Sequence, residues 1–274
     1  TMLELIDHAE KAQPYLLMCF NKAIATEAEK RMRSATTVRT FNSLGHKIWA
    51  AAVDRKLSLN QKKILEIFRA IADETPRGER SYLWSMYDSV LAATSIARNI
   101  GYIPPDHFKA SKSLCDFSAV ERLLDETLLP EAEALINKVL TISIQQAYNG
   151  VIDFTDQVYM PALFGGTYPS FPVVLVDEYQ DLSPVNRAMI ARLCKHSRQI
   201  GVGDEAQAIY EFRGADVRAM PDAIEQFDMV TLPLSISFRC PTAITDNVHW
   251  HVPDIRSVRS GGTVARGNIQ SIED

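Results

Sequence analysis

The sequence lacks the features that mark three classes of protein. Its four cysteines, Cys19, Cys115, Cys194 and Cys240, lie far apart and form no CxxC pair. We therefore expect reduced thiols rather than a zinc site or a disulfide framework. No apolar run approaches the roughly 20 residues of a membrane span, and the start carries no secretory signal pattern. These absences favour a cytoplasmic protein with no membrane partner.

An excess of positive charge is also absent. The 274 residues carry a formal net charge of -5, which is not typical of a chain whose whole surface binds nucleic acid. A local groove of positive field would still suffice for such binding. Hydrophobic residues make up 46% of the chain, enough to bury the core of one large domain or of two smaller ones.

Short apolar or β-branched runs alternate with helical stretches along the chain. Continuous apolar runs of this length between helices predict parallel strands that are covered on both faces. The expected fold class is therefore α/β with a parallel sheet. The predicted strands are residues 15–20, 37–41, 173–177, 199–202 and 229–234.

Between the second and third of these runs, residues 61–147 show helical periodicity, as in Leu124, Leu128, Leu135 and Val139. This block is interpreted as a helical insertion, and its basic residues Lys62, Lys63 and Arg69 as plain surface. We expect residues 1–60 and 148–250 to form one discontinuous α/β domain. Residues 251–274 are expected to be a hinge or the beginning of a second domain.

The strongest chemical signal is the segment VVLVDEYQDLS, which begins at Val173. A buried strand ends at two adjacent carboxylates, where ligands bind in open α/β sheets. Asp177 could hold Mg²⁺, and Glu178 could orient and deprotonate an attacking water. The alternative is an acidic helix N-terminus favoured by the helix dipole; the longer DEYQD string argues against it.

Two later segments carry further candidates. VGDEAQAIYEFRGA places Gln207, a polar sensor, just before Tyr210 and Phe212, whose rings could stack on bases or belong to the core. In LSISFRCP, Arg239 could reach a phosphate across a cleft or form a surface salt bridge.

In this order, the three segments resemble motifs II, III and IV of UvrD/Rep-type superfamily 1 DNA helicases. MCFNKAIATEAEKR, from Met18, is similar to motif Ia of that family, and RTFNSLG, from Arg39, resembles its TFHSLG motif. VIDFTDQV, from Val151, resembles a short segment upstream of motif II, interpreted as partly structural. The resemblance implies a RecA-like P-loop NTPase sheet with an inserted helical subdomain.

The resemblance also implies a role for particular residues. Asp177 would be the Mg²⁺ ligand and Glu178 the catalytic base. Gln207 and Arg239 would contact the γ-phosphate of ATP, and Arg213 would contact nucleotide or link the two sites. Asn42 stands where the family usually has histidine. The implied DNA contacts are Phe20, Asn21, Thr40, Phe41, Asn42, Tyr210 and Phe212.

The phosphate-binding pattern GxxxxGK[ST] is absent from the 274 residues. The resemblance implies that the chain begins within or just after this loop, which would make Thr1 a nucleotide-binding residue. We expect the strand before the loop to be missing, which would leave sheet edges uncovered. A second RecA-like domain, with motifs V and VI, would also be missing.

The implied function is that of an ATP-dependent DNA helicase or translocase, moving 3′ to 5′, with ATP and Mg²⁺ as cofactors. Its partners would be single-stranded DNA, duplex junctions and accessory repair or recombination proteins. We expect this fragment to be inactive alone. The alternatives are the helicase component of a RecB- or AddA-like helicase–nuclease, and a non-catalytic DNA-binding scaffold.

Overall fold

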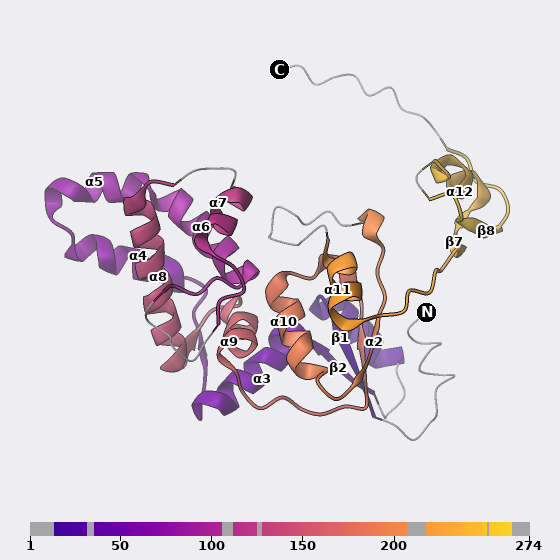
Figure 1. Ribbon diagram of the computed structural model, residues 1–274, viewed down its shortest axis with the longest axis horizontal. Helices are drawn as coiled ribbons and strands as arrows, with labels where there is room; N and C mark the ends of the chain where they lie inside the picture. Colours follow the sequence, from indigo (N-terminus) through magenta and orange to yellow (C-terminus); the bar gives the residue numbers. More distant parts are fainter. Residues whose placement is uncertain are drawn as a thin grey trace, which may run out of the picture. The chain divides into compact units, whose positions relative to one another are not determined.

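The computed structural model describes residues 14–31, 36–105, 112–124, 128–207, 218–250 and 252–264. Four of the sequence candidates, Thr1, Tyr210, Phe212 and Arg213, lie outside these ranges. The chain divides into two compact units, Thr1–Ala223 and Ile224–Asp274, which are described separately (Figure 1).

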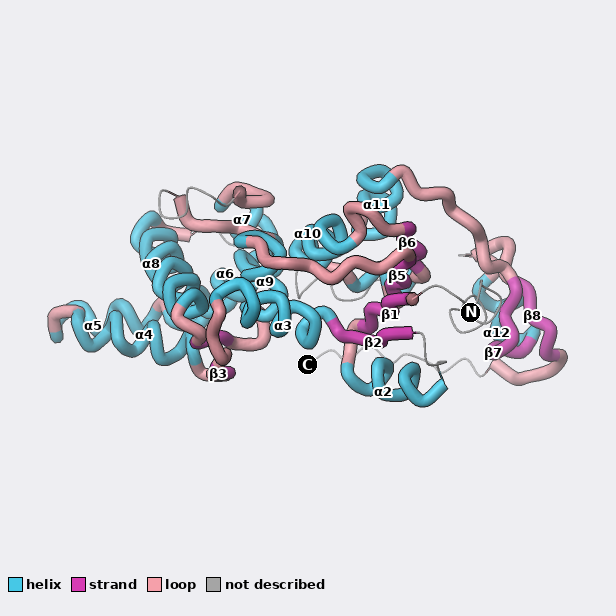
Figure 2. The backbone as a smooth tube through the Cα atoms, turned by 90° about the horizontal axis from the view of Figure 1, so that it is seen from below, coloured by secondary structure: helices cyan, strands magenta, loops and turns pink. Residues whose placement is uncertain are grey.

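The first unit is built on a four-stranded parallel sheet in the order β2-β1-β5-β6 (Figure 2). The inner strands β1 (Tyr15–Cys19) and β5 (Val173–Val176) are buried along their whole length, because YLLMC and VVLV are apolar on both faces. The outer strands are β2 (Thr36–Thr40) and β6 (Arg198–Gly201). Four of the five predicted strands and the predicted α/β class are therefore confirmed.

The predicted strand at residues 229–234 is wrong. The second unit instead forms β7 (Ile236–Pro241), which pairs in parallel with β8 (Arg256–Arg259) and carries the short helix α12 (Thr242–Val248). In the preceding segment, Val230 is 86% exposed and Leu232 81%. The apolar run pairs with no strand among the described residues, and Pro233 lacks the amide that a ladder would need.

Five of the described helices precede or follow the strands of the four-stranded sheet in the chain. They are α2 (Lys22–Arg31), α3 (Phe41–Val53), α9 (Asp156–Phe164), α10 (Pro184–Leu193) and α11 (Ala219–Phe227), whose end lies in the second unit. Thr40 and Ser43 form a capping box that begins α3. Gly45 allows α3 to approach α9 closely, since a Cβ there would lie 1.8 Å from the Gln157 carbonyl oxygen.

A block of helices with its own apolar core stands beside the sheet (Figure 1). The short strands β3 (Ser58–Leu59) and β4 (Val151–Ile152) pair in parallel where the chain enters and leaves the block. Most of the described residues within 61–147 are therefore helical, as expected, while the assignment of domain boundaries stays a prediction. The helices are α4 (Lys63–Glu74), α5 (Arg77–Ser85), α6 (Tyr87–Ile100), α7 (Phe117–Leu124) and α8 (Pro130–Tyr148).

The four cysteines are free. Among the described helices, none is long and apolar enough to cross a membrane.

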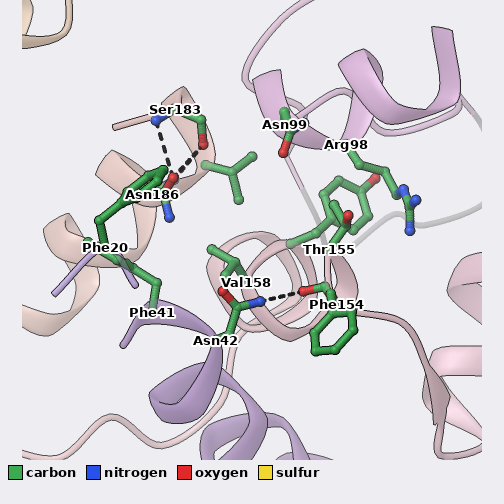
Figure 3. A pocket seen from close by; sticks show the side chains of 12 residues that line it. Phe20, Phe41, Asn42, Arg98, Asn99, Phe154, Thr155, Val158, Ser183 and Asn186 are labelled. Carbon is green, nitrogen blue, oxygen red and sulfur yellow. Dashed lines mark hydrogen bonds between the residues drawn. The ribbon is translucent and has the colours of Figure 1, made fainter. Parts of the chain in front are cut away.

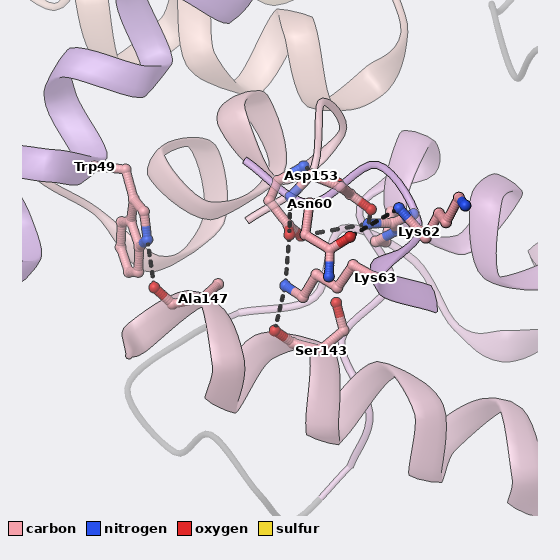
Figure 4. A network of polar contacts seen from close by, with 9 residues as sticks. Trp49, Asn60, Lys62, Lys63, Ser143, Ala147 and Asp153 are labelled. Atoms are coloured by element: carbon pink, nitrogen blue, oxygen red, sulfur yellow. Dashed lines mark hydrogen bonds and ion pairs between the residues drawn. The ribbon is translucent and has the colours of Figure 1, made fainter. Parts of the chain in front are cut away.

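Lys63, Arg98, Asp153 and Asp156 form a buried cluster of charged side chains, of which Figure 4 labels Lys63 and Asp153. Lys63 Nζ lies 2.6 Å from Asp156 Oδ2 and donates to the Ser143 carbonyl at 2.7 Å. Arg98 Nη1 lies 2.6 Å from Asp153 Oδ2 and 3.4 Å from Asp156 Oδ1. Two cations thus compensate two carboxylates away from water, which is the condition for burying either pair.

The interpretation of Lys63 as plain surface is therefore wrong, although Lys62 and Arg69 are exposed as expected. Lys63 is 1% exposed because it lies four residues before Ile67, on the buried face of α4. Its carboxylate partner is 93 residues away in the chain, so no local pattern could have indicated the ion pair.

We predict that Lys63→Met lowers the free energy of unfolding by about 3–5 kcal/mol, because Arg98 alone would face both buried carboxylates. Lys62→Met is the matched control and should change it by less than about 0.5 kcal/mol, because Lys62 is exposed. Urea denaturation followed by circular dichroism measures both. Equal stability of the two variants would contradict the role of the cluster.

Candidate functional site

The predicted acidic pair lies at the carboxyl end of the buried strand β5. The Asp177 amide still pairs with β1, donating to the Met18 carbonyl at 3.1 Å. Burial, and then the adjacent charge of Glu178, raise the pKa of the Asp177 carboxyl above its ordinary value. Asp177 is thus a partly desolvated carboxylate, as expected of a group that binds a cation.

Glu178 adopts a left-handed backbone conformation, with φ 51° and ψ 52°. This region is uncommon for a residue other than glycine and costs free energy. The turn ends β5 and starts a short 3₁₀ helix, η1 (Tyr179–Asp181). An observed backbone strain of this kind at a strand end supports a functional assignment for Glu178.

Hydrogen bonds connect Glu178 to the loop after the neighbouring strand β6. Glu178 Oε2 accepts from Gln180 Nε2 at 2.7 Å, and Gln180 Oε1 accepts from the Asp204 amide at 3.1 Å. Asp204 Oδ2 in turn accepts from Gln207 Nε2 at 2.7 Å, in the 3₁₀ helix η2 (Glu205–Gln207). The structure thus brings the predicted base and the predicted sensor into one hydrogen-bonded set, through Gln180, a residue for which the sequence indicated no role.

The residues present fit a magnesium-bound nucleotide. Mg²⁺ prefers oxygen ligands and commonly takes only one or two carboxylates, with water and phosphate oxygens completing its shell. Asp177 supplies such a carboxylate, and no cluster of three potential metal-binding side chains occurs among the described residues. Asp177 would therefore share Mg²⁺ with phosphate oxygens rather than complete a cage of protein ligands.

Three of the predicted DNA contacts converge on one pocket of about 290 Å³. Phe20, Phe41 and Asn42 line it, and Asn42 Nδ2 donates to the Phe154 carbonyl at 2.6 Å (Figure 3). The volume is at the low end of the range for ligand sites. Several lining residues were not predicted as contacts from the sequence: Asn99, Phe154, Val158, Ser183 and Asn186. Two of them, Phe154 and Val158, lie in VIDFTDQV.

Asn21 and Thr40 do not line this pocket. Asn21 Oδ1 accepts from the Ile24 amide at 2.9 Å, and Thr40 Oγ1 accepts from the Ser43 amide at 3.1 Å. Both side chains thus cap the first turns of helices, and their contact with DNA stays a prediction.

Arg239 lies on β7 of the second unit. Its side chain is exposed, and its carbonyl accepts from Arg259 Nη1 at 2.9 Å. Its predicted contact with a phosphate stays a prediction. The same holds for Thr1, Arg213, Tyr210 and Phe212, which lie outside the described residues.

A parallel sheet with an acidic pair at the end of a buried strand, and a polar loop after the next strand, defines a RecA-like α/β domain. A model of the UvrD/REP helicase N-terminal domain matches residues 1–228. The chain belongs to this helicase family.

The chain is also similar to parts of three characterised proteins. RecBCD enzyme subunit RecB of Escherichia coli is 30% identical over 118 residues, 37% of this chain and 10% of RecB. An ATP-dependent helicase/nuclease subunit of Natranaerobius thermophilus is 26% identical over 53% of this chain and 13% of that protein. DNA helicase IV of Escherichia coli is 49% identical over 16% of this chain and 7% of that protein. The chain thus spans only a small part of the length of these relatives.

We predict that Asp177→Asn raises the free energy of unfolding at pH 7. A carboxyl whose folded-state pKa exceeds its unfolded value near 3.9 opposes folding once it is ionised. The penalty is therefore complete above the folded-state pKa and disappears as the pH falls below the unfolded value. The gain from the substitution should shrink in the same window, as measured by urea denaturation from pH 7 to pH 3.5.

Asp254→Asn, in an exposed turn, is the control and should change stability little at any of these pH values. A loss of stability in Asp177→Asn at pH 7 would contradict the assignment of Asp177 as a desolvated carboxylate.

Proposed function

We propose that this chain is the ATP-binding region of an ATP-dependent DNA helicase or translocase that moves 3′ to 5′ on single-stranded DNA. One observation carries the proposal. Residues 177–186 contain the acidic pair at one end and, at the other, Ser183, Val185 and Asn186 of the pocket. A single short segment therefore joins the proposed sites of hydrolysis and DNA binding.

In the proposed reaction, bound ATP with Mg²⁺ supplies the phosphoryl group that passes to water. Asp177 would hold Mg²⁺, and the Glu178 carboxylate would orient the attacking water and accept its proton. Gln207 and Arg239 would contact the γ-phosphate. The left-handed turn at Glu178 and its bond from Gln180 support this role, because they restrict the carboxylate to one direction.

On the DNA side, the rings of Phe20 and Phe154 would stack on bases, which needs no particular sequence. Phe154 is 51% exposed although it is a large apolar residue, as expected of a side chain that meets a ligand. Duplex junctions and accessory repair or recombination proteins are the further partners proposed.

A second candidate function is the helicase component of a helicase–nuclease. The similarity to RecB and to the helicase/nuclease of Natranaerobius thermophilus favours it. A non-catalytic DNA-binding scaffold is less favoured, because such a protein would have no physical need for the strained turn at Glu178.

We predict that Phe20→Ala and Phe154→Ala each weaken binding to a labelled oligo(dT) about tenfold, since one stacked base is worth roughly 1–3 kcal/mol. Tyr82→Ala is the control. Tyr82 is an aromatic residue as exposed as Phe154, 52% against 51%, but it does not line the pocket. Fluorescence anisotropy at one fixed salt concentration measures all three. The pocket is not the DNA site if the Tyr82 variant loses as much affinity as the others.

We further propose that this chain by itself hydrolyses ATP poorly, because it contains no GxxxxGK[ST] to hold the phosphates. ATP hydrolysis is measured with and without single-stranded DNA, on this chain and on a longer version that carries such a pattern ahead of Thr1. The extended version should be stimulated by DNA, and Glu178→Gln should slow it about 10²–10⁴-fold. Equal turnover by the chain without the extension would contradict the proposal.

A further inference from the structure

Gln180 has a buried side chain whose amide nitrogen and amide oxygen both form hydrogen bonds. It is 3% exposed. Its Nε2 donates to Glu178 Oε2 at 2.7 Å, while its Oε1 accepts from the Asp204 amide at 3.1 Å. The amide supplies both the donor and the acceptor that this arrangement needs, whereas a carboxylate at the same position would repel Glu178.

The surroundings of Gln180 are built closely around this amide. A Cβ at position 203 would lie 2.7 Å from Gln180 Oε1 and 2.9 Å from Met220 Sδ, so only glycine fits there without displacement. Backbone bonds from Asp181 to Glu178 (3.0 Å) and from Leu182 to Tyr179 (3.4 Å) hold the turn that carries Gln180. The Gln180 amide is therefore confined by the close approach of Gly203 and by the hydrogen-bonded turn that carries it.

Joining the two strands does not itself require Gln180. The ladder between β5 and β6 continues past its end, with Val202 N donating to Val176 O at 2.9 Å and Tyr179 N to Val202 O at 3.0 Å. Gln199 Nε2 also donates to the Tyr179 hydroxyl at 2.6 Å. Gln180 adds a hydrogen bond to the Glu178 carboxylate, which none of these other contacts involves.

We propose that Gln180 is a positioning residue that holds the Glu178 carboxylate and the loop of Gln207 in one fixed relation. The set is continuous, because Asp204 accepts from the Gln207 side chain at 2.7 Å. A displacement of either residue is transmitted to the other through Gln180 and Asp204. The assignment to the hydrolytic reaction rests on the proposed function, in which Glu178 is the base and Gln207 the sensor.

The test uses the chain as it is, without nucleotide or DNA, and compares wild type with Gln180→Met and Gly203→Ala. The first removes both bonds of the amide at similar volume, and the second displaces the amide without changing it. Gln199→Met is the matched control, because it removes a glutamine hydrogen bond between β6 and η1 that involves neither Glu178 nor Asp204. NMR measures three quantities: the exchange rate of the Asp204 amide, the Glu178 carboxyl carbon shift and the Gln207 side-chain amide shift.

Gln180→Met and Gly203→Ala are expected to speed exchange at Asp204 about five- to tenfold, as for one lost hydrogen bond, and to move both side-chain signals. Gln199→Met should leave all three quantities unchanged. The proposal is overturned if the control moves the same signals, or if neither test variant moves the Glu178 signal. If one test variant fails to fold, as seen by circular dichroism, the other still decides.

This outcome is separate from that of the proposed function. If the Gln180 variants behave as expected but the chain binds no single-stranded DNA, Gln180 still positions Glu178 and Gln207, and the proposed helicase function is contradicted. If the chain binds single-stranded DNA but the NMR signals are unchanged in both test variants, the proposed function stands and the role of Gln180 is contradicted.

Discussion

The buried ion pairs around Asp153 and Asp156 are the constraint on which the arrangement of the first unit depends. Lys63 and Arg98 come from the helical block, and the two carboxylates flank Phe154 at the beginning of α9. Each aspartate also accepts from the other's amide, at 2.9 Å in both directions. The turn of Phe154 is thereby fixed, and its carbonyl receives the Asn42 amide at the pocket. The buried ion pairs of Asp153 and Asp156 thus determine the position of Phe154, which lines the pocket.

The second organising feature is the segment that follows β5. Its first part must be strained, because Glu178 turns the chain out of a fully buried strand in a left-handed conformation. Its last part is an ordinary helix start, in which Ser183 and Asn186 form a capping box at α10. Strain at one end and a rigid cap at the other leave little freedom between the acidic pair and the pocket. The proposed function would need such a connection, because in it hydrolysis at the acidic pair changes the binding of DNA at the pocket.

The sequence predicted what depends on local pattern. The strands β1 and β5 could be recognised because they are apolar on both faces, and the acidic pair because it follows such a strand directly. What it could not predict depends on partners distant in the chain. Asn42 and Phe154 meet across 112 residues, Lys63 finds its carboxylate across 93, and Gln180 acquires a role only when β6 lies beside β5. The prediction of a strand at residues 229–234 is wrong for the same reason, because an apolar run forms a strand only where a partner strand exists.

Hydrogen exchange of the chain with and without oligo(dT), followed by mass spectrometry, tests most directly whether the pocket is a DNA site. If the pocket binds DNA, oligo(dT) should slow exchange together in three segments that are distant in sequence and meet at the pocket, around Phe20, Asn42 and Phe154. The segment at Asp73 and Glu74, at the exposed end of α4, should be unaffected. Protection confined to one of the three segments, or found only on the helical block, would show that DNA does not bind at the pocket.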